Sequence, residues 1–261
     1  MNGPVLVRER ELAQPGLHTH NFNRRAVEQQ PRQGRGNLFW VRVVLLFLGL
    51  TGVGYYGYRL ADQQIYQGYE NWAFNQQIGG RSAVTFADYV RETTPFGFLA
   101  GERPAPRSPV QQSSVQAAGG PAPGSILGRV EVGRLNLMAM VREGVDSDTL
   151  SRAVGHVPTT ALAGQSGNFA IAAHRDTLFR ALKDIHKGDV VTFESQAGTY
   201  KYEVFATRIV KPSDISVLRA VGGLGPQRNE SLLTMITCYP FYYVGSAPKR
   251  FIVQAKLLSK G

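Results

Sequence analysis

The sequence predicts an all-β domain over residues 126–261, preceded by a membrane-spanning helix and a flexible linker. Three observations lead to this organisation. Short apolar runs alternate with turn residues throughout the predicted domain, a largely apolar stretch occupies residues 38–58, and residues 102–125 are rich in Pro, Ala, Gly, Ser and Gln. A domain of this length can bury a core of its own.

The predicted strands are four- and five-residue apolar runs separated by turn residues. Turns are expected at residues 188–189 and 197–198, and their spacing suits a closed barrel built mainly from antiparallel strands. A short helix is expected over residues 148–154. The four clearest runs lie at residues 128–132, 137–141, 190–193 and 202–205.

The apolar stretch at residues 38–58 is long enough to cross a membrane as a helix. Its 21 residues would span about 31 Å as a helix, against roughly 30 Å for the hydrocarbon core of a bilayer. Arg42 and Arg59 flank the uncharged part and can extend their guanidinium groups to the interface. The sequence therefore places a membrane segment at residues 38–60.

The amino-terminal tail, residues 1–37, carries six arginines against three glutamates. By the positive-inside rule, this tail is expected in the cytoplasm and the rest of the chain outside. A cleavable signal peptide is the competing interpretation, but the polar region is long for one and no small-x-small cleavage site follows the apolar block. The pattern favours an uncleaved single-pass anchor in the cell membrane.

Residues 61–125 connect the anchor to the predicted domain. Residues 102–125 have the composition of a flexible spacer, which would give the domain reach from the bilayer. The part before the spacer mixes aromatic residues with Gln and Asn, and the aromatic residues either pack on the domain or lie at the lipid surface. They are Tyr66, Tyr69, Trp72, Phe74, Phe86, Tyr89, Phe96 and Phe98.

The chain is strongly basic, with a net charge of +10 from 29 basic and 19 acidic residues. Such a charge suits nucleic acid, anionic lipid or an acidic cell envelope, and does not choose among them. Because six arginines are explained by membrane topology, most of the case for nucleic acid disappears. No nucleic-acid partner is expected.

Cys238 is the single cysteine of the chain and ends an apolar run that begins at residue 231. The run stops there because a Tyr-Pro pair follows. Exported domains ordinarily use cysteines in pairs, as disulfides, so an unpaired thiol needs a reason. A catalytic nucleophile is one reason, and a buried cysteine that acts as a small hydrophobic residue is the other.

Two further residues are expected close to Cys238. The strand predicted at residues 168–174 ends in His174, and the two side chains share one rim if this strand runs parallel to the cysteine strand. Arg250 begins an apolar segment that should return antiparallel, at the same edge as Cys238. A thiolate can attack a carbonyl, an imidazole can protonate a leaving amine, and a guanidinium can stabilise an oxyanion.

Structural explanations compete with a catalytic role for these partners. A histidine at a strand end is often a surface residue, and an arginine that begins a strand is often a solvated flank. Two other histidines are also candidates: His156, on a predicted loop, and His186, in a charged stretch. Neither of them ends an apolar strand, and His174 is therefore preferred.

Three segments resemble the sequence motifs of sortases. Residues 234–238, Thr-Met-Ile-Thr-Cys, are similar to the family's Thr-Leu-x-Thr-Cys signature, with Met235 in place of Leu. Residues 173–177 resemble the family's His-Arg segment, and residues 247–251 resemble its arginine strand. The motifs occur in the family's order over about residue 126 to the carboxyl terminus. The stretch after the cysteine is most similar to class D sortases, with class E next.

The resemblance implies an eight-stranded β-barrel with short helices and a transpeptidase that cuts an LPxTG-like sorting signal. By position, Cys238 would be the nucleophile, His174 the general acid and base, and Arg250 the contact to the substrate and the oxyanion. A small fraction of enzyme with both thiolate and imidazolium would give a bell-shaped pH profile. Three neighbouring motif residues are expected to contact the substrate: Thr237, Ala173 and Ile236.

The implied partners are substrate proteins with a carboxyl-terminal LPxTG-like signal, an amine acceptor of the cell envelope, and membrane lipid around the anchor. A membrane-bound cysteine peptidase that hydrolyses the same signal is one alternative, and a non-catalytic peptide-binding module is another. Some class A members carry calcium-responsive loops of clustered acidic residues. Here Asp146 and Asp148 instead resemble the start of a helix, so neither a metal nor a cofactor is expected.

Overall fold

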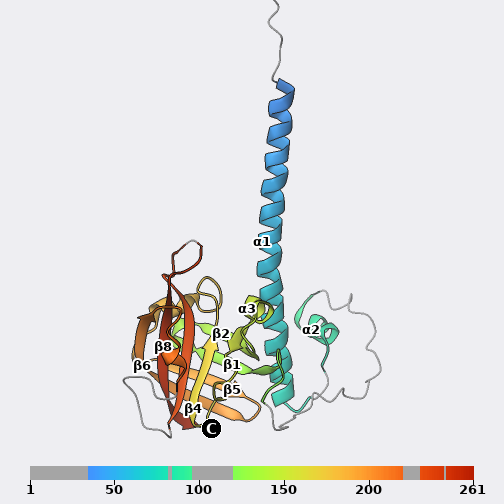
Figure 1. Ribbon diagram of the computed structural model, residues 1–261. Helices are drawn as coiled ribbons and strands as arrows, with labels where there is room; N and C mark the ends of the chain where they lie inside the picture. Colours follow the sequence, from blue (N-terminus) through green and yellow to red (C-terminus); the bar gives the residue numbers. More distant parts are fainter. Residues whose placement is uncertain (1–34, 82–83, 96–119, 220–229, 244) are drawn as a thin grey trace, which may run out of the picture. The chain divides into compact units, whose positions relative to one another are not determined.

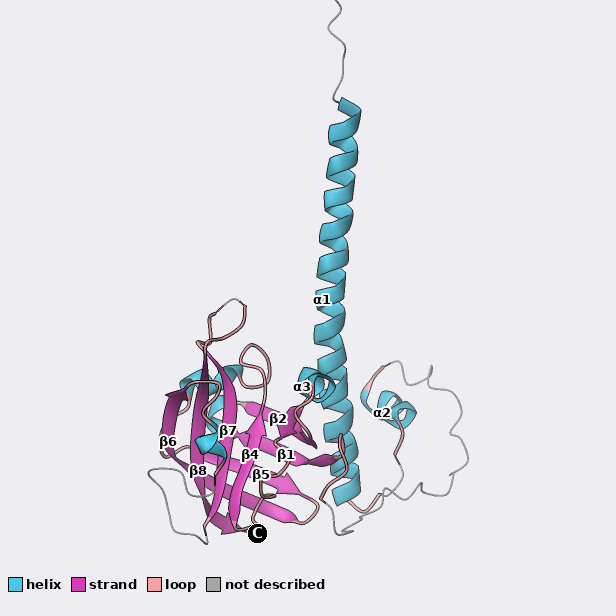
Figure 2. Cartoon of the chain, in the orientation of Figure 1, coloured by secondary structure: helices cyan, strands magenta, loops and turns pink. Residues whose placement is uncertain are grey.

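The computed structural model describes residues 35–81, 84–95, 120–219, 230–243 and 245–261, with side chains from Leu38 onward. The chain divides into two compact units, residues 1–51 and residues 52–261. The eight strands of the described part lie in the second unit and close into a barrel (Figure 1, Figure 2). The predicted eight-stranded barrel is therefore confirmed.

The strands and helices follow one another in a simple order. The strands are β1 Ile126–Val132, β2 Leu137–Glu143, β3 Val154–His156, β4 Gly167–Ala172, β5 Val190–Ser195, β6 Gly198–Val210, β7 Ser231–Tyr239 and β8 Lys249–Lys260. The α-helices are α1 Arg35–Ile78, α2 Phe86–Thr93 and α3 Ser147–Arg152, and the 3-10 helices are η2 Gly133–Leu135, η3 Arg180–Asp184 and η4 Ile215–Leu218.

Around the barrel the order is β1-β2-β3-β4-β7-β8-β6-β5, and β5 returns to β1. Two neighbouring pairs are parallel, β2 with β3 and β4 with β7, and the others are antiparallel. A parallel pair needs a crossover connection. The chain supplies one through α3 between β2 and β3, and a longer one through β5 and β6 between β4 and β7.

The barrel interior is filled by large side chains that alternate along each strand with outward-facing residues. Phe169 and Phe193 meet edge to face with ring centroids 4.8 Å apart. The hydroxyl of the buried Tyr202 accepts a hydrogen bond from the backbone N–H of Gly164 at 2.9 Å. Burying a side chain of this size contributes about 1.5–3 kcal/mol. Other residues of the core are Val130, Val141, Ile171, Leu233, Met235 and Val253.

Two strands differ from their predicted form. β6 extends from Gly198 to Val210, well beyond the predicted residues 202–205, because it pairs with β8 along nearly its whole length. The prediction of a loop around His156 is wrong, because this residue ends β3. Here β3 lies so close to the segment that follows β2 that a Cβ on Gly155 would lie 2.3 Å from the carbonyl oxygen of Gly144. A three-residue strand that contains a glycine has no apolar period by which the sequence could reveal it.

The predicted short helix is present as α3, shifted by one or two residues. Asp146 is its amino-terminal cap, with one carboxylate oxygen 3.0 Å from the backbone N–H of Thr149 and the other 2.8 Å from its hydroxyl. These hydrogen bonds lower the pKa of the Asp146 carboxyl. The expected role of this acidic residue as a helix start is therefore confirmed.

α1 is a continuous helix of 44 residues, about twice the length of the predicted membrane segment. Its apolar side chains at residues 38–58 are exposed, and the helix is long and apolar enough to cross a membrane. Beyond residue 61 the helix changes character, because buried side chains such as Gln63 and Phe74 appear.

Within the unit of residues 52–261, the last turns of α1 pack against β1, β2 and α3. The side-chain amide of Gln67 connects α1 to α3 and to β2. Its Nε2 donates to the carbonyl of Arg152 in α3 at 2.7 Å, and its Oε1 accepts from the N–H of Met140 in β2 at 2.8 Å. Arg152 also pairs with Asp62 at 3.2 Å. Phe74, 3% exposed, packs on the barrel beneath the guanidinium of Arg129 in β1, which lies 5.7 Å from the centre of its ring.

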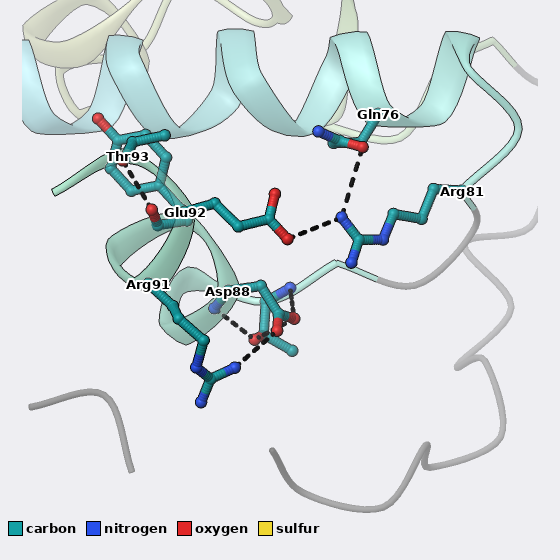
Figure 3. Close-up of polar contacts among 8 residues, drawn as sticks. Gln76, Arg81, Asp88, Arg91, Glu92 and Thr93 are labelled. Carbon is teal, nitrogen blue, oxygen red and sulfur yellow. Dashed lines mark hydrogen bonds and ion pairs between the residues drawn. The ribbon is translucent and has the colours of Figure 1, made fainter. Parts of the chain in front are cut away.

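α2 lies against the same end of α1 (Figure 3). Arg81 donates to Glu92 at 3.0 Å and to Gln76 at 3.5 Å, so one guanidinium joins α2 to α1. Thr85 and Asp88 form a capping box at the start of α2. Four aromatic rings pack together between the two helices, those of Tyr69, Trp72, Phe86 and Tyr89.

Candidate active site

Cys238 and Arg250 lie opposite each other in the sheet. β7 and β8 pair antiparallel, as the sequence predicts, and the register sets Cys238 beside Arg250. β4 runs parallel to β7, with Ala172 beside Ile236. Because two parallel neighbours end at the same edge, the chain leaves β4 close to Cys238. The strand directions on which the shared rim depends are therefore as expected.

The side chains of Cys238 and Arg250 lie on the outer face of the barrel. Met235 belongs to the core, and Cys238 is three residues further along the same strand, so it has the opposite orientation. Val253 is likewise in the core, three residues after Arg250. The thiol is therefore presented at the rim of the barrel and is kept out of its apolar interior.

The three residues expected to contact the substrate form the frame of the rim. The hydroxyl of Thr237 donates to the carbonyl of Ala173 at 2.8 Å, and the N–H of Ala173 donates to the carbonyl of Ile236 at 3.2 Å. Thr237 and Ala173 are buried, and Ile236 is half-buried. These bonds lock the end of β4 to β7 directly before His174, and a contact with substrate stays a prediction.

The thiol, the imidazole and the guanidinium line one pocket of about 260 Å³. His174 is exposed, and Cys238 and Arg250 are half-buried, so a peptide can reach all three groups from solvent. A larger depression of about 420 Å³ lies over β2 and η3 and contains none of the three. The smaller pocket is lined by His174, Arg175, Asp176, Cys238, Gly245, Ser246, Ala247 and Arg250.

The guanidinium of Arg250 is held by main-chain carbonyls at the junction between the β7–β8 connection and β8. Its Nη1 donates to the carbonyl of Ala247 at 3.2 Å and to the carbonyl of Lys249 at 3.0 Å. Both acceptors are neutral main-chain oxygens, and a guanidinium has five N–H donors. Arg250 therefore has donors left for a carbonyl oxygen or an oxyanion in the pocket.

Arg175 lines the pocket, although no role was predicted for it from the sequence. Its Nη2 donates to the carbonyls of Tyr243 at 2.6 Å and Gly245 at 3.1 Å. The signal in the sequence was its position directly after His174. No pattern in a single sequence could show that its partners lie in a loop 68 residues away.

His156 lies in β3, outside this pocket, and is fully engaged. Its Nδ1 is 2.6 Å from a carboxylate oxygen of Glu143, and its Nε2 is 2.9 Å from the hydroxyl of Thr160. The ring also packs against Phe169, with centroids 5.3 Å apart. A histidine that is 2% exposed in such a network has a structural role.

His186 belongs to a separate polar cluster. Its Nδ1 lies 3.0 Å from the guanidinium of Arg134, and its backbone N–H donates to Asp189 at 2.7 Å. The hydrogen bond from Arg134 holds the pKa of the Asp189 carboxyl below its usual value. Within the described ranges, three or more His, Cys, Asp and Glu side chains do not gather in any place as metal ligands would.

Comparison with known proteins relates this chain to the sortases. The family model described as a sortase domain matches residues 130–258. Sortase D of Bacillus subtilis is 32% identical over 182 residues, which cover 68% of this chain and 89% of that protein. Sortase SrtE2 of Streptomyces coelicolor is 27% identical over 166 residues, covering 56% of this chain and 64% of that protein. Among solved structures, a Clostridium perfringens sortase D5 transpeptidase is 27% identical with a TM-score of 0.47, over 53% of this chain and 82% of that one.

A barrel with a thiol, an imidazole and a guanidinium around one rim pocket fits the class of cysteine-dependent acyl-transfer enzymes. The chain belongs to the sortase family, because it aligns with nearly the full length of a sortase at 32% identity and its barrel matches the family model. It is accordingly a cysteine transpeptidase, an enzyme whose substrates are proteins with sorting signals.

Proposed function

We propose that this transpeptidase is anchored in the cell membrane, cleaves an LPxTG-like sorting signal and joins the acyl group to an amine of the cell envelope. The observation that carries the proposal is the pocket shared by Cys238, His174 and Arg250. Each of the three supplies a group that acyl transfer requires: a nucleophile, an acid and base, and a cationic donor.

In the first half-reaction, the Cys238 thiolate attacks the Thr carbonyl carbon of the signal. The carbonyl oxygen becomes an oxyanion, which the spare N–H groups of Arg250 stabilise. The bond between the carbonyl carbon and the following nitrogen then breaks, and the His174 imidazolium gives its proton to the departing amine. A thioester on Cys238 and a neutral His174 remain.

The second half-reaction reverses these steps with a new amine. The acceptor nitrogen attacks the thioester carbonyl, and neutral His174 takes the proton that the amine loses. The carbon–sulfur bond breaks and restores the thiolate. Water competes slowly with the amine, and the ratio of amide to acid products reports how well the pocket distinguishes the two.

The membrane position rests on α1 and on the tail before it. The helix is long and apolar enough to cross a membrane, with Arg42 as the one charged residue of its stretch at residues 38–58, and residues 1–37 contain six arginines against three glutamates. The positive-inside rule then puts the amino terminus in the cytoplasm and the barrel outside. This side of the membrane is where the amines of the cell envelope are found.

The test uses the fact that the chain has one cysteine. Incubation with an LPxTG peptide and a primary amine should give an intact-mass adduct of the acyl group, and an amide product. Cys238→Ala should abolish both. His174→Ala should lower kcat by roughly 10²- to 10⁴-fold, as expected for a lost general acid and base. His186→Ala is the matched control outside the pocket and should retain activity.

Three results would contradict the proposal in different ways. Turnover retained in Cys238→Ala would exclude the thioester route. An acid product alone, at saturating amine, would make the chain a peptidase. Absence of any adduct or cleavage with a set of sorting peptides would favour a peptide-binding module.

A further inference from the structure

The loop between β7 and β8 forms one wall of the catalytic pocket. We call residues 240–243 and 245–248 the β7–β8 loop. Gly245, Ser246 and Ala247 from this loop face the pocket, and His174, Arg175 and Asp176 face it from the chain that follows β4. Cys238 and Arg250 lie between the two walls at the paired strand ends. The width of the pocket therefore depends on how these two segments are held together.

Arg175 joins the two walls. Its backbone is in the segment after β4, and its Nη2 donates to two carbonyls of the loop, those of Tyr243 at 2.6 Å and Gly245 at 3.1 Å. Its guanidinium carbon also lies 5.9 Å from the centre of the Tyr243 ring. One side chain thus bonds a wall to its opposite wall at the point where the loop enters the pocket.

Two arginines bind the carbonyls of the loop and of its junction with β8. Arg175 donates to the carbonyls of Tyr243 and Gly245, and Arg250 donates to that of Ala247 in the loop and to that of Lys249 at the start of β8. A substrate oxygen that binds the spare N–H groups of Arg250 draws on the same guanidinium that holds this end of the loop. Arg175 then remains as the cation that retains the loop, because its own acceptors lie further from the strand end.

Arg175 also has a donor to spare. Its Nη1 is buried and finds no hydrogen-bond partner in the part of the chain that the structure describes. A buried N–H without a partner is uncommon in folded proteins. Because this N–H group is enclosed between the two walls, it can gain a partner only when the chain around it moves.

From these contacts we infer that Arg175 is a positioning residue of this enzyme: it fixes the β7–β8 loop against the segment after β4 and so shields the thioester on Cys238 from water. This inference rests on the proposed function. The thioester carbonyl carbon bonds either to an amine nitrogen or to a water oxygen, and in both cases the carbon–sulfur bond breaks. A loosened wall admits water and misplaces the acceptor, so the balance moves toward acid.

The experiment compares three full-length variants with the wild-type chain in detergent. Arg175→Met removes the bridge and keeps the length of the side chain, and Arg175→Lys keeps a charge and a donor. Arg180→Met is the matched control, because it removes an exposed cation of the same segment that does not line this pocket. For each chain the acid and amide products are measured at one amine concentration, together with kcat and KM for the peptide.

Arg175→Met should lower kcat/KM by roughly ten- to a hundredfold, in line with the cost of misplaced reacting groups, and should raise the ratio of acid to amide by about threefold or more. Arg175→Lys should recover part of both, and Arg180→Met should match the wild type. An unchanged product ratio in Arg175→Met would overturn the inference, whether the total rate stays the same or falls, because general destabilisation lowers both products equally.

A second measurement does not depend on transpeptidase activity. The rate of alkylation of Cys238 by iodoacetamide is followed against pH, and its limiting value at high pH reports exposure of the thiol separately from its pKa. Arg175→Met should raise this limiting rate by about threefold or more, and Arg180→Met should not. Equal limiting rates in all chains would refute the role of Arg175 in holding the loop, whether or not the wild type cleaves a sorting peptide. Failure of the wild type to cleave any sorting peptide would instead count against the proposed function alone.

Discussion

The barrel uses arginine in two different ways, to fix a helix on one side and to hold a loop at the rim. In the part of the chain that the structure describes, the hydrogen bonds of the Arg129 guanidinium go to side chains of the helix and of a neighbouring strand. Those of Arg250 in β8 go to main-chain carbonyls, one in the loop before β8 and one at the first residue of β8. The partners of Arg129 are Asn71 at 2.6 Å, Asn75 at 3.0 Å, the carboxylate of Glu194, and the ring of Phe74 at 5.7 Å.

The two sets of partners suit different roles, one in the stability of the fold and one in the proposed reaction. Arg129 has a carboxylate to neutralise it and amide oxygens to fill its donors, so breaking the set leaves several polar groups without partners. The bonds of Arg250 are to neutral main-chain acceptors and use Nη1 alone. The contact of Arg129 holds α1 on the barrel, and in the proposed mechanism the remaining N–H groups of Arg250 serve the substrate.

Replacement of Arg250 should give the largest effect on catalysis among these arginines. Arg250→Ala is expected to lower kcat/KM by roughly ten- to a thousandfold, as for a lost oxyanion donor. The free energy of unfolding should change little, because the two bonds that are lost go to neutral carbonyls, and one of them is exposed and the other only partly buried. Peptide kinetics and thermal melting of the same preparation measure the two quantities. A near-normal kcat/KM would mean that Arg250 has a structural role and does not stabilise the oxyanion.

Arg129→Met should give the opposite pattern. The variant leaves Glu194 and two asparagines without their shared partner, so the free energy of unfolding should fall by about 1–3 kcal/mol. The kcat/KM of the remaining folded enzyme should stay within about twofold of wild type, since Arg129 does not line the pocket. Denaturant unfolding beside peptide kinetics would show this. A large loss of kcat/KM with normal stability would mean that the helix side and the rim are coupled.

The rim was predictable because its signals are local. A strand that ends in Cys238, one that ends near His174 and one that begins at Arg250 each have a clear apolar run, and the register of such strands brings their ends together. The role of Arg175 was not predictable, because it depends on two carbonyls in a distant loop. Backbone acceptors have no signature in the amino-acid sequence.

The contacts between α1 and the barrel could not be predicted from sequence patterns. The apolar residues of α1 predicted a membrane segment, but its polar continuation to Ile78 has no apolar period. Gln67 is informative only in the structure, where its amide is matched to Met140 and Arg152. The spacer expected at residues 102–125 lies mostly outside the described residues. Long-range polar pairing of this kind needs coordinates, since any exposed glutamine would look the same in the sequence.

The polar cluster around Asp189 predicts how the free energy of unfolding depends on pH. Its carboxylate is buried, and two hydrogen bonds from Arg134 hold its pKa below the ordinary value of 3.8. A lowered pKa in the folded state means that the carboxylate stabilises the protein above pH 3.8 and that this contribution is lost as the pH falls through the folded pKa. Urea unfolding between about pH 5 and pH 2 should therefore show a shallower loss of stability in Asp189→Asn than in wild type. Equal slopes would mean that Asp189 titrates normally.

The contact between α2 and α1 should give the smallest effect. Arg81 and Glu92 are 3.0 Å apart, and both side chains are 36% exposed. Solvent screens an ion pair of this kind, so Glu92→Gln should lower the free energy of unfolding by no more than about 0.5 kcal/mol at low salt. The loss should disappear at about 1 M salt, where the screening length is near 3 Å. Since the four aromatic rings between the helices remain in place, a loss above about 2 kcal/mol would mean that this one pair, and not the ring cluster, holds α2 on α1.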